Sequence, residues 1–144
     1  MLQKIIKTDN AATTILIRLV VGAVFLSEGI QKFLFADTIG AGRFEKIGLP
    51  NPEFLGPFVG GFEITCGSCI LIGLLTRLAS IPLIIIMLTA ISTTKIPILI
   101  NEGFWTMVHE SRTDWAMLLS CIFLLIKGGG RWSVDRKITN HRWT

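Results

Sequence analysis

The sequence predicts an all-α, polytopic membrane protein built as a bundle of four transmembrane helices. Hydrophobic residues make up 51% of the 144 residues and charged residues only 17%, against about a quarter charged in soluble domains. The apolar residues are gathered into four long blocks instead of alternating with polar ones. Both features place the chain in the membrane class and argue against an ordinary soluble domain.

The first three apolar blocks are long enough to cross a bilayer, because a spanning helix needs about 20 predominantly apolar residues. They predict helices over about residues 12–35, 55–75 and 78–100, with Pro97 near the outer end of the third. The fourth block is short, so we expect its helix to begin earlier than its apolar run and to cover about residues 107–127. A single membrane domain over residues 1–144 is expected.

The first block is interpreted as a retained helix and not as a cleaved signal peptide. Lys4 and Lys7 precede it, as in the charged start of a signal peptide. However, the apolar stretch is long, contains Arg18, Glu28 and Lys32, and lacks a clear small-x-small cleavage site.

Basic residues are expected to orient the helices, because short cytoplasmic loops carry an excess of lysine and arginine. The two tails and the turn between the second and third helices carry eight: Lys4, Lys7, Arg77, Lys127, Arg131, Arg136, Lys137 and Arg142. The other two loops carry four: Arg43, Lys46, Lys95 and Arg112. This bias predicts that both termini are cytoplasmic. The net charge of +4 is therefore interpreted as topology and contact with anionic lipid headgroups, not as nucleic-acid binding.

Ionisable residues inside the apolar blocks are the candidate functional residues, because a charge at membrane depth is costly and usually faces the protein interior. Five are expected at one depth, in the outer half of the bundle: Glu28, Lys32, Glu63, Lys95 and Asp114. His109 and Arg112 are expected beside them, at the outer boundary of the fourth helix. Arg18 is expected nearer the cytoplasmic end, paired with another helix or with a lipid phosphate.

Two interpretations of this charged layer stay open. It is either an ion-pair network that holds the helices together, or a polar pocket that binds a headgroup or relays protons. Intramembrane acids favour the pocket, and His109 is a natural proton-transfer group near neutral pH. Gly22 and Gly29 lie on the same face of the first helix as Lys32 and would let another helix approach closely.

Cys66 and Cys69 form a Cys-x-x-C pair in the middle of the second helix. A redox pair of this spacing usually lies at a helix N-terminus, and this pair does not. Close packing of two small residues is therefore favoured, while thiol redox chemistry stays open. A metal site is not expected. Cys121 and His109 could complete a four-ligand set only if they happened to lie at the same membrane depth as Cys66 and Cys69.

The ordered set of motifs along the chain resembles the DoxX family of small four-helix bacterial inner-membrane proteins. The matching motifs are Arg18-x-x-x-Gly22-x-x-Phe25-x-x-x-Gly29-x-x-Lys32, "GLPNP", Gly60-x-x-Glu63-x-x-x-Gly67, "GLLTRLA" and "GGGRWSVD". The resemblance implies an inner-membrane protein linked to respiratory or thiol redox chemistry, since founding members look like subunits of a thiosulfate:quinone oxidoreductase. Family sequences often carry histidine at position 28, where this chain has Glu28, and the family does not require the Cys-x-x-C.

These expectations lead to three functional hypotheses. The first is a redox-associated subunit or accessory of quinone- or thiol-linked oxidoreduction, with quinone as the candidate cofactor. The second is a transporter or permeation module for protons or a small solute. The third is a non-catalytic assembly subunit that binds a partner protein or a second copy of itself. Whether the chain is itself an enzyme stays open, and membrane lipid is a partner in all three.

Overall fold

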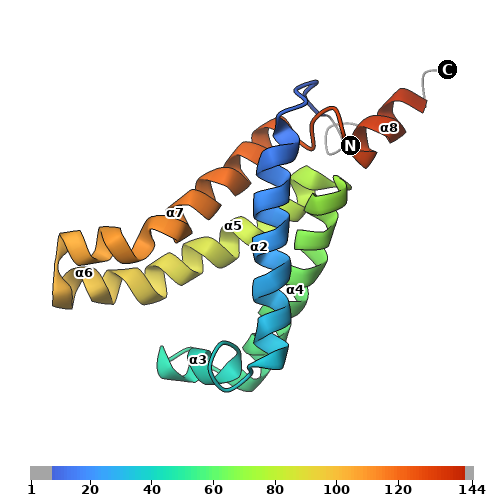
Figure 1. Cartoon of the computed structure of the whole chain (residues 1–144). Coiled ribbons are helices and arrows are strands. Elements are labelled where there is room, and N and C mark those ends of the chain that lie inside the picture. Colours follow the sequence, from blue (N-terminus) through green and yellow to red (C-terminus); the bar gives the residue numbers. More distant parts are fainter. Residues whose placement is uncertain (1–7, 142–144) are drawn as a thin grey trace.

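Two pairs of antiparallel helices frame the molecule (Figure 1). The first pair is α2 (Thr14–Leu34) with α4 (Pro52–Ile72), and the second is α5 (Thr76–Ala90) with α7 (Phe104–Lys127). The pairs meet near the chain termini and diverge towards the opposite end. We call the end that carries the termini the terminal side, and the end that carries the short helix α3 (Ala41–Lys46) the loop side.

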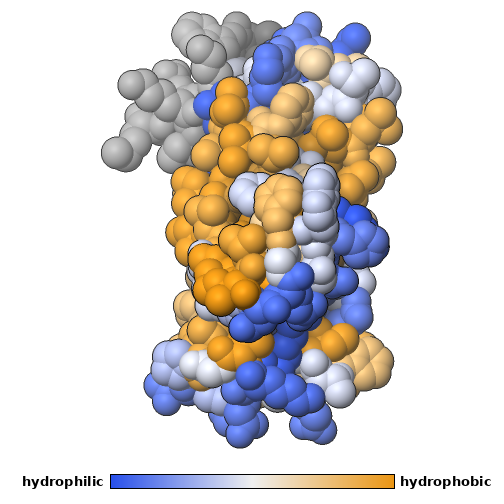
Figure 2. Space-filling view, turned by 90° about the vertical axis from the view of Figure 1, so that its left-hand side faces the viewer, coloured by the Kyte–Doolittle hydropathy of each residue, from blue (hydrophilic) through white to orange (hydrophobic). Residues whose placement is uncertain are grey.

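The computed structural model describes residues 8–141, so Lys4, Lys7 and Arg142 of the orientation argument lie outside the described residues. Three segments are long and apolar enough to cross a membrane: Thr14–Leu34, Pro52–Ile72 and Thr76–Glu102. α7 is 24 residues long but carries polar residues in its first half. Hydrophobic residues cover much of the middle of the face shown in Figure 2, and hydrophilic residues gather towards both its loop side and its terminal side. The predicted class, an all-α polytopic membrane protein, is confirmed.

Glycines set the distance between α2 and α4. A Cβ added at Gly29 would lie 2.7 Å from the carbonyl oxygen of Gly60, and one added at Gly22 would lie 2.9 Å from that of Gly67. The two backbones therefore touch at two levels, as small residues allow in membrane helices. The expected close approach at Gly22 and Gly29 is confirmed, with α4 as the partner.

The third apolar segment differs from its prediction at the loop side. Pro97 does not end the helix: α5 passes into a π-helical turn, η1 (Ile91–Lys95), and continues as α6 (Ile96–Glu102). Pro97 lies directly after the π-helical turn, as the second residue of α6. The chain then turns at Gly103 with φ 91°, and α7 begins directly at Phe104.

A network of hydrogen bonds between buried polar groups joins the helices on the terminal side. The Arg18 guanidinium is 2% exposed and donates to four carbonyl oxygens. Asp135 is also buried and accepts from the N–H groups of Leu75 and Thr76, at 2.7 and 3.0 Å. Leu75 has φ 49°, a left-handed conformation that costs free energy in a non-glycine residue, and the Asp135 carboxylate holds it there. Asp135 thus caps α5 and anchors α8 (Val134–His141).

Candidate functional site

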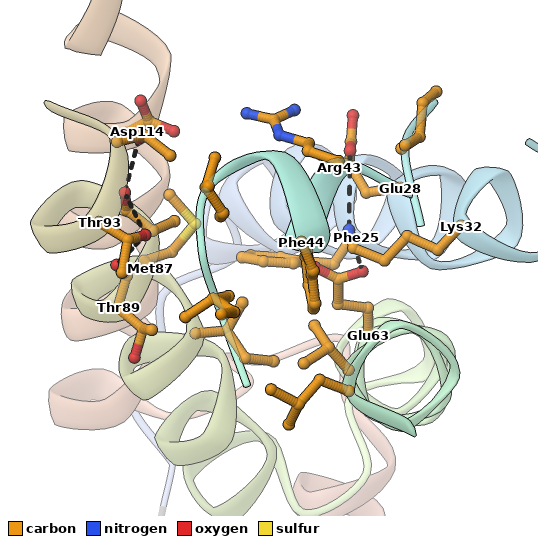
Figure 3. Close-up of a pocket in the computed structure, with 18 of the residues that line it drawn as sticks. Phe25, Glu28, Lys32, Arg43, Phe44, Glu63, Met87, Thr89, Thr93 and Asp114 are labelled. Carbon is orange, nitrogen blue, oxygen red and sulfur yellow. Dashed lines mark hydrogen bonds and ion pairs between the residues drawn. The ribbon is translucent and has the colours of Figure 1, made fainter. Parts of the chain in front are cut away.

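A cavity of about 450 Å³ lies between the two helix pairs. Its lining comes from α2, α3, α4, α5, η1 and α7, so it depends on both pairs and on the loop-side helix. The size is typical of a small-molecule site. Figure 3 shows polar side chains on two opposite sides of this cavity and apolar ones between them.

One side is formed by the Lys32 cluster, which we define as Glu28, Lys32, Glu63 and Arg43. The Lys32 Nζ lies 2.7 Å from the Oε2 of Glu63 and 3.9 Å from the Oε2 of Glu28. Exposure rises along this series: the Glu63 side chain is 4% exposed, Lys32 9% and Glu28 46%. A buried acid is thus joined through one ammonium to an acid that reaches the surface.

The glycine contacts explain why Lys32 and Glu63 meet. Gly29 and Lys32 are three residues apart on α2, and Gly60 and Glu63 are three apart on α4, so each pair shares a helix face. Because α2 and α4 are antiparallel, Lys32 and Glu63 lie one turn from the Gly29–Gly60 contact in opposite directions, and the long Lys32 side chain spans this offset to reach Glu63. The same close packing leaves both side chains nearly buried.

The opposite side is formed by the Asp114 cluster, which we define as Asp114, Thr89, Thr93 and Thr94. Asp114 Oδ2 forms an ion pair of 3.2 Å with the Nζ of Lys95. The threonines come from the end of α5 and from η1, and Figure 3 shows Thr89 and Thr93 on the same side as Asp114. The π-helical turn therefore lies in the wall of the cavity, as such turns often do at functional sites.

Apolar and aromatic side chains separate the two clusters. Figure 3 places Phe25 and Phe44 between them, with Met87 towards the Asp114 cluster. Phe58 of α4 and Met117 of α7 also line the cavity. Flat aromatic faces and flexible methionines suit an apolar ring as ligand. The site can therefore hold a flat apolar group with polar atoms at its two ends.

The structure brings four of the predicted site residues to this cavity: Glu28, Lys32, Glu63 and Asp114. Lys95 is the ion-pair partner of Asp114 and does not line the cavity. Arg18 lies in the hydrogen-bond network on the terminal side, where it donates to carbonyl oxygens. The expected single layer of charges is thus two clusters facing each other, and Arg18 belongs to neither.

His109 and Arg112 lie on an exposed face of α7, outside the cavity lining. An Arg112 guanidinium nitrogen contacts His109 Nε2 at 2.7 Å and donates to the His109 carbonyl oxygen at 3.0 Å. Since α7 starts three residues before the expected helix, this pair sits on its second and third turns instead of at a helix entry. A role for either residue stays a prediction.

The three cysteines are free thiols in the described part of the chain. Cys66 and Cys121 are buried in the hydrophobic core, and Cys69 packs against that core while partly exposed. None of the three lines the cavity. Within residues 8–141, no group of three or more histidine, cysteine or acidic side chains is arranged to hold a metal ion.

Sequence reasoning missed Arg43, Phe44 and the threonines of the cavity wall. Arg43 and Phe44 lie on α3, a six-residue helix inside a stretch that reads as a glycine- and proline-rich loop. Their alternation with polar residues in "GRFEKIG" is too short to give a helical period. The pair Thr93-Thr94 was a readable signal, because two adjacent hydroxyls interrupt an otherwise apolar helix.

Comparison with known proteins identifies the relatives of this chain. It is 49% identical over 142 residues to "Uncharacterized membrane protein Rv3486" of Mycobacterium tuberculosis (strain ATCC 25618 / H37Rv), covering 94% of this chain and 87% of that protein. It is 29% identical over 125 residues to "Putative oxidoreductase CatD" of Bacillus subtilis (strain 168), covering 85% and 84%. No solved structure matches significantly. The DoxX family model matches residues 13–96, more than half of the chain, and the protein therefore belongs to the DoxX family.

Proposed function

We propose that this protein is a redox-associated membrane protein whose cavity binds the headgroup of a quinone-class molecule. The observation that carries the proposal is the cavity itself, in which an aromatic and apolar middle lies between two polar clusters. A quinone headgroup has the same pattern, because it is a flat apolar ring with an oxygen at each of two opposite positions. Pockets of this kind use a few placed polar groups to orient an apolar ligand.

The Lys32 cluster supplies the groups that such a ligand needs. Lys32 and Arg43 are cationic donors for a ligand oxygen, and hydrogen bonds from charged donors are the strong ones. Glu63 and Glu28 are carboxylates that can exchange protons with a bound oxygen or with solvent. The redox cofactor chemistry would be the ligand's, while the chain binds it, orients it and moves protons.

Similarity to a protein named as an oxidoreductase supports a redox association for this chain. We infer that the chain acts as a subunit or accessory of an oxidoreductase system, with the electron-transferring partner supplied by another protein. Membrane lipid surrounds its apolar helices.

We also infer an orientation in the bacterial plasma membrane, with both termini in the cytoplasm. The described basic residues on the terminal side support it: Arg77, Lys127, Arg131, Arg136 and Lys137. The loop side would then face outward, and the cavity would lie in the outer half of the bundle.

Binding of duroquinone and its hydroquinone to the purified protein tests the proposal. We expect at least one of the two forms to bind, as measured by anaerobic equilibrium dialysis in detergent. The double variant Lys32→Met/Glu63→Gln removes both charges of the buried pair together, so it avoids an isolated buried charge. We expect its affinity to fall about tenfold or more, since hydrogen bonds to charged groups contribute about 1.5–3 kcal/mol.

Lys46→Met is the matched control, because Lys46 is an exposed lysine of α3 that does not line the cavity. It should bind like the natural protein. Failure of both ligand forms to bind, or equal binding by the double variant, would overturn the proposed function.

A further inference from the structure

The two sides of the cavity differ in which hydrogen-bonding groups they offer. Each threonine hydroxyl of the Asp114 cluster already donates its proton to the backbone one turn earlier. Thr89 donates to Ile85 at 2.9 Å, Thr93 to Thr89 at 2.8 Å, and Thr94 to Ala90 at 2.6 Å. A hydroxyl whose proton is already donated in a hydrogen bond can still accept another hydrogen bond through its lone pairs. The threonines therefore face the cavity as acceptors.

Asp114 also offers hydrogen-bond acceptors to the cavity. An ionised carboxylate only accepts hydrogen bonds, and it can accept several. Lys95 contacts its Oδ2, which balances the charge, while Lys95 itself does not line the cavity. A ligand atom at this side therefore meets acceptors from Asp114 and from the threonines. The Lys32 cluster differs, because it combines the donors Lys32 and Arg43 with two carboxylates.

We infer that the cavity selects a ligand with a hydroxyl donor at the Asp114 cluster, which for a quinone-class molecule is the reduced, hydroquinone form. This inference rests on the proposed function. A quinone would point a carbonyl oxygen at a set of acceptors, with no donor between them. A hydroquinone donates one hydroxyl to Asp114 or a threonine, while its other oxygen accepts from Lys32 or Arg43 and donates to Glu63. Thr93 and Asp114 are thus specificity residues, and the π-helical turn presents one of them.

The selectivity ratio tests the inference. Anaerobic calorimetry in detergent measures the Kd of duroquinone, of its hydroquinone and of the dimethyl ether of that hydroquinone. We expect the hydroquinone to bind about tenfold or more tightly than the other two, as a site built to bond a hydroxyl discriminates against analogues that lack one. Asp114→Asn adds an amide donor to the subsite, so it should weaken hydroquinone binding, strengthen quinone binding and bring the ratio close to one.

Matched controls separate this effect from a general disturbance. Glu110→Gln changes an exposed acid one turn earlier on α7 and should leave the ratio unchanged. Thr93→Val should lower the ratio, while Thr65→Val should not. Thr65 is an exposed threonine of α4 that also donates to the backbone, at 2.8 Å, but lies outside the cavity lining.

The outcomes are distinguishable from those of the proposed function. Equal binding of both forms by the natural protein would overturn the inference and leave quinone-class binding intact. An unchanged ratio in Asp114→Asn would also overturn it, and if that variant does not fold, Thr93→Val decides by the same criterion. Failure of all three compounds to bind would remove the inference together with the function on which it rests.

Discussion

Arg18 is a buried cation whose partners are backbone carbonyls. Its Nε donates to Ile70 at 2.9 Å, and its terminal nitrogens reach Leu71, Gly129 and Trp132. Ile70 and Leu71 lie in the last turn of α4, where helix carbonyls commonly need partners from outside the helix, and the Ile70 carbonyl also accepts from the Gly73 N–H. The planar guanidinium with five donors suits this task. The sequence predicted a charge near this helix end, but it could not predict carbonyl partners more than 50 residues away.

Replacing Arg18 with lysine should destabilise the protein. A lysine keeps the charge but cannot reach both the end of α4 and the loop after α7, so some carbonyls lose their donor. We expect a loss of about 2 kcal/mol or more, measured as a lower Tm in detergent. Arg131→Lys is the control, since Arg131 is exposed. Equal melting of Arg18→Lys and the natural protein would show that these hydrogen bonds do not stabilise the fold.

Asp9 lies outside the helices, where its carboxylate accepts a hydrogen bond of 3.0 Å from Lys127. This hydrogen bond lowers the pKa of Asp9 below its ordinary value. The pair therefore stabilises the fold above pH of about 3.9, the unfolded value, and this contribution is lost as the pH falls through the lowered pKa. Both side chains are exposed, so the effect on stability should be small.

The titration of Asp9 itself checks this assignment. Carboxyl carbon NMR should show a pKa below the ordinary range in the natural protein, and a rise towards that range in Lys127→Gln. Lys137→Gln, an exposed lysine of α8, should leave it unchanged. An ordinary pKa for Asp9 in the natural protein would contradict the pairing.

At the scale of elements, α2 and α4 are readable from the sequence because glycines and charges recur on one face. Gly29 of α2 meets Gly60 of α4 at backbone distance, while Gly61, next along the chain, has no atom near its added Cβ. Gly29→Ala should therefore push the helices apart and destabilise the protein by about 1–3 kcal/mol, the usual cost of overpacking. It should also weaken ligand binding, because Lys32 and Glu63 would separate.

Gly61→Ala is the matched control for this packing, since its added methyl group meets open space. Thermal melting should show a loss of stability for Gly29→Ala alone. Equal loss in both variants would mean that the cost does not come from contact between α2 and α4.

The loop-side elements were less predictable, for a physical reason. Hydrophobic periodicity marks long helices, but it does not locate a π-helical turn or a six-residue helix. Pro97 was expected at a helix end because proline usually stops helices, whereas here it restarts one after η1. The charged residues of the cavity were found because charge in an apolar block is conspicuous. Arg43 and Phe44 were not, since their segment carries no such contrast.

At the scale of the whole molecule, the divergence of the two helix pairs creates the cavity. The hydrogen-bond network of Arg18 and Asp135 holds the two helix pairs together on the terminal side, and the space between the pairs widens towards the loop side. The sequence shows four apolar blocks and so predicts a four-helix bundle. It does not show the angle between the two helix pairs, because this angle depends on Arg18 and Asp135, from the two ends of the chain, joining one hydrogen-bond network.

The same divergence gives the corner between α6 and α7 an unusual position. In Figure 1 this corner lies level with the lower half of α2 and not with its loop-side end. It carries exposed charged residues, Glu102, Glu110 and Arg112, and Trp105 is 80% exposed beside them. Charges at membrane depth need water or a partner, while tryptophan favours the membrane interface. We therefore expect the membrane surface, or a water-filled recess, to reach this corner.

Thiol labelling in intact cells or sealed vesicles tests that expectation together with the orientation. Glu110→Cys should react with a membrane-impermeant maleimide added on the outer side, and Lys137→Cys only with reagent added on the cytoplasmic side. The natural protein is the background control, because Cys66 and Cys121 are buried and Cys69 is only partly exposed. Labelling of Glu110→Cys by membrane-permeant reagents alone would place the corner in lipid or against another protein. Labelling of both variants from one side would contradict the orientation, because the corner and α8 lie at different ends of the same helix, α7.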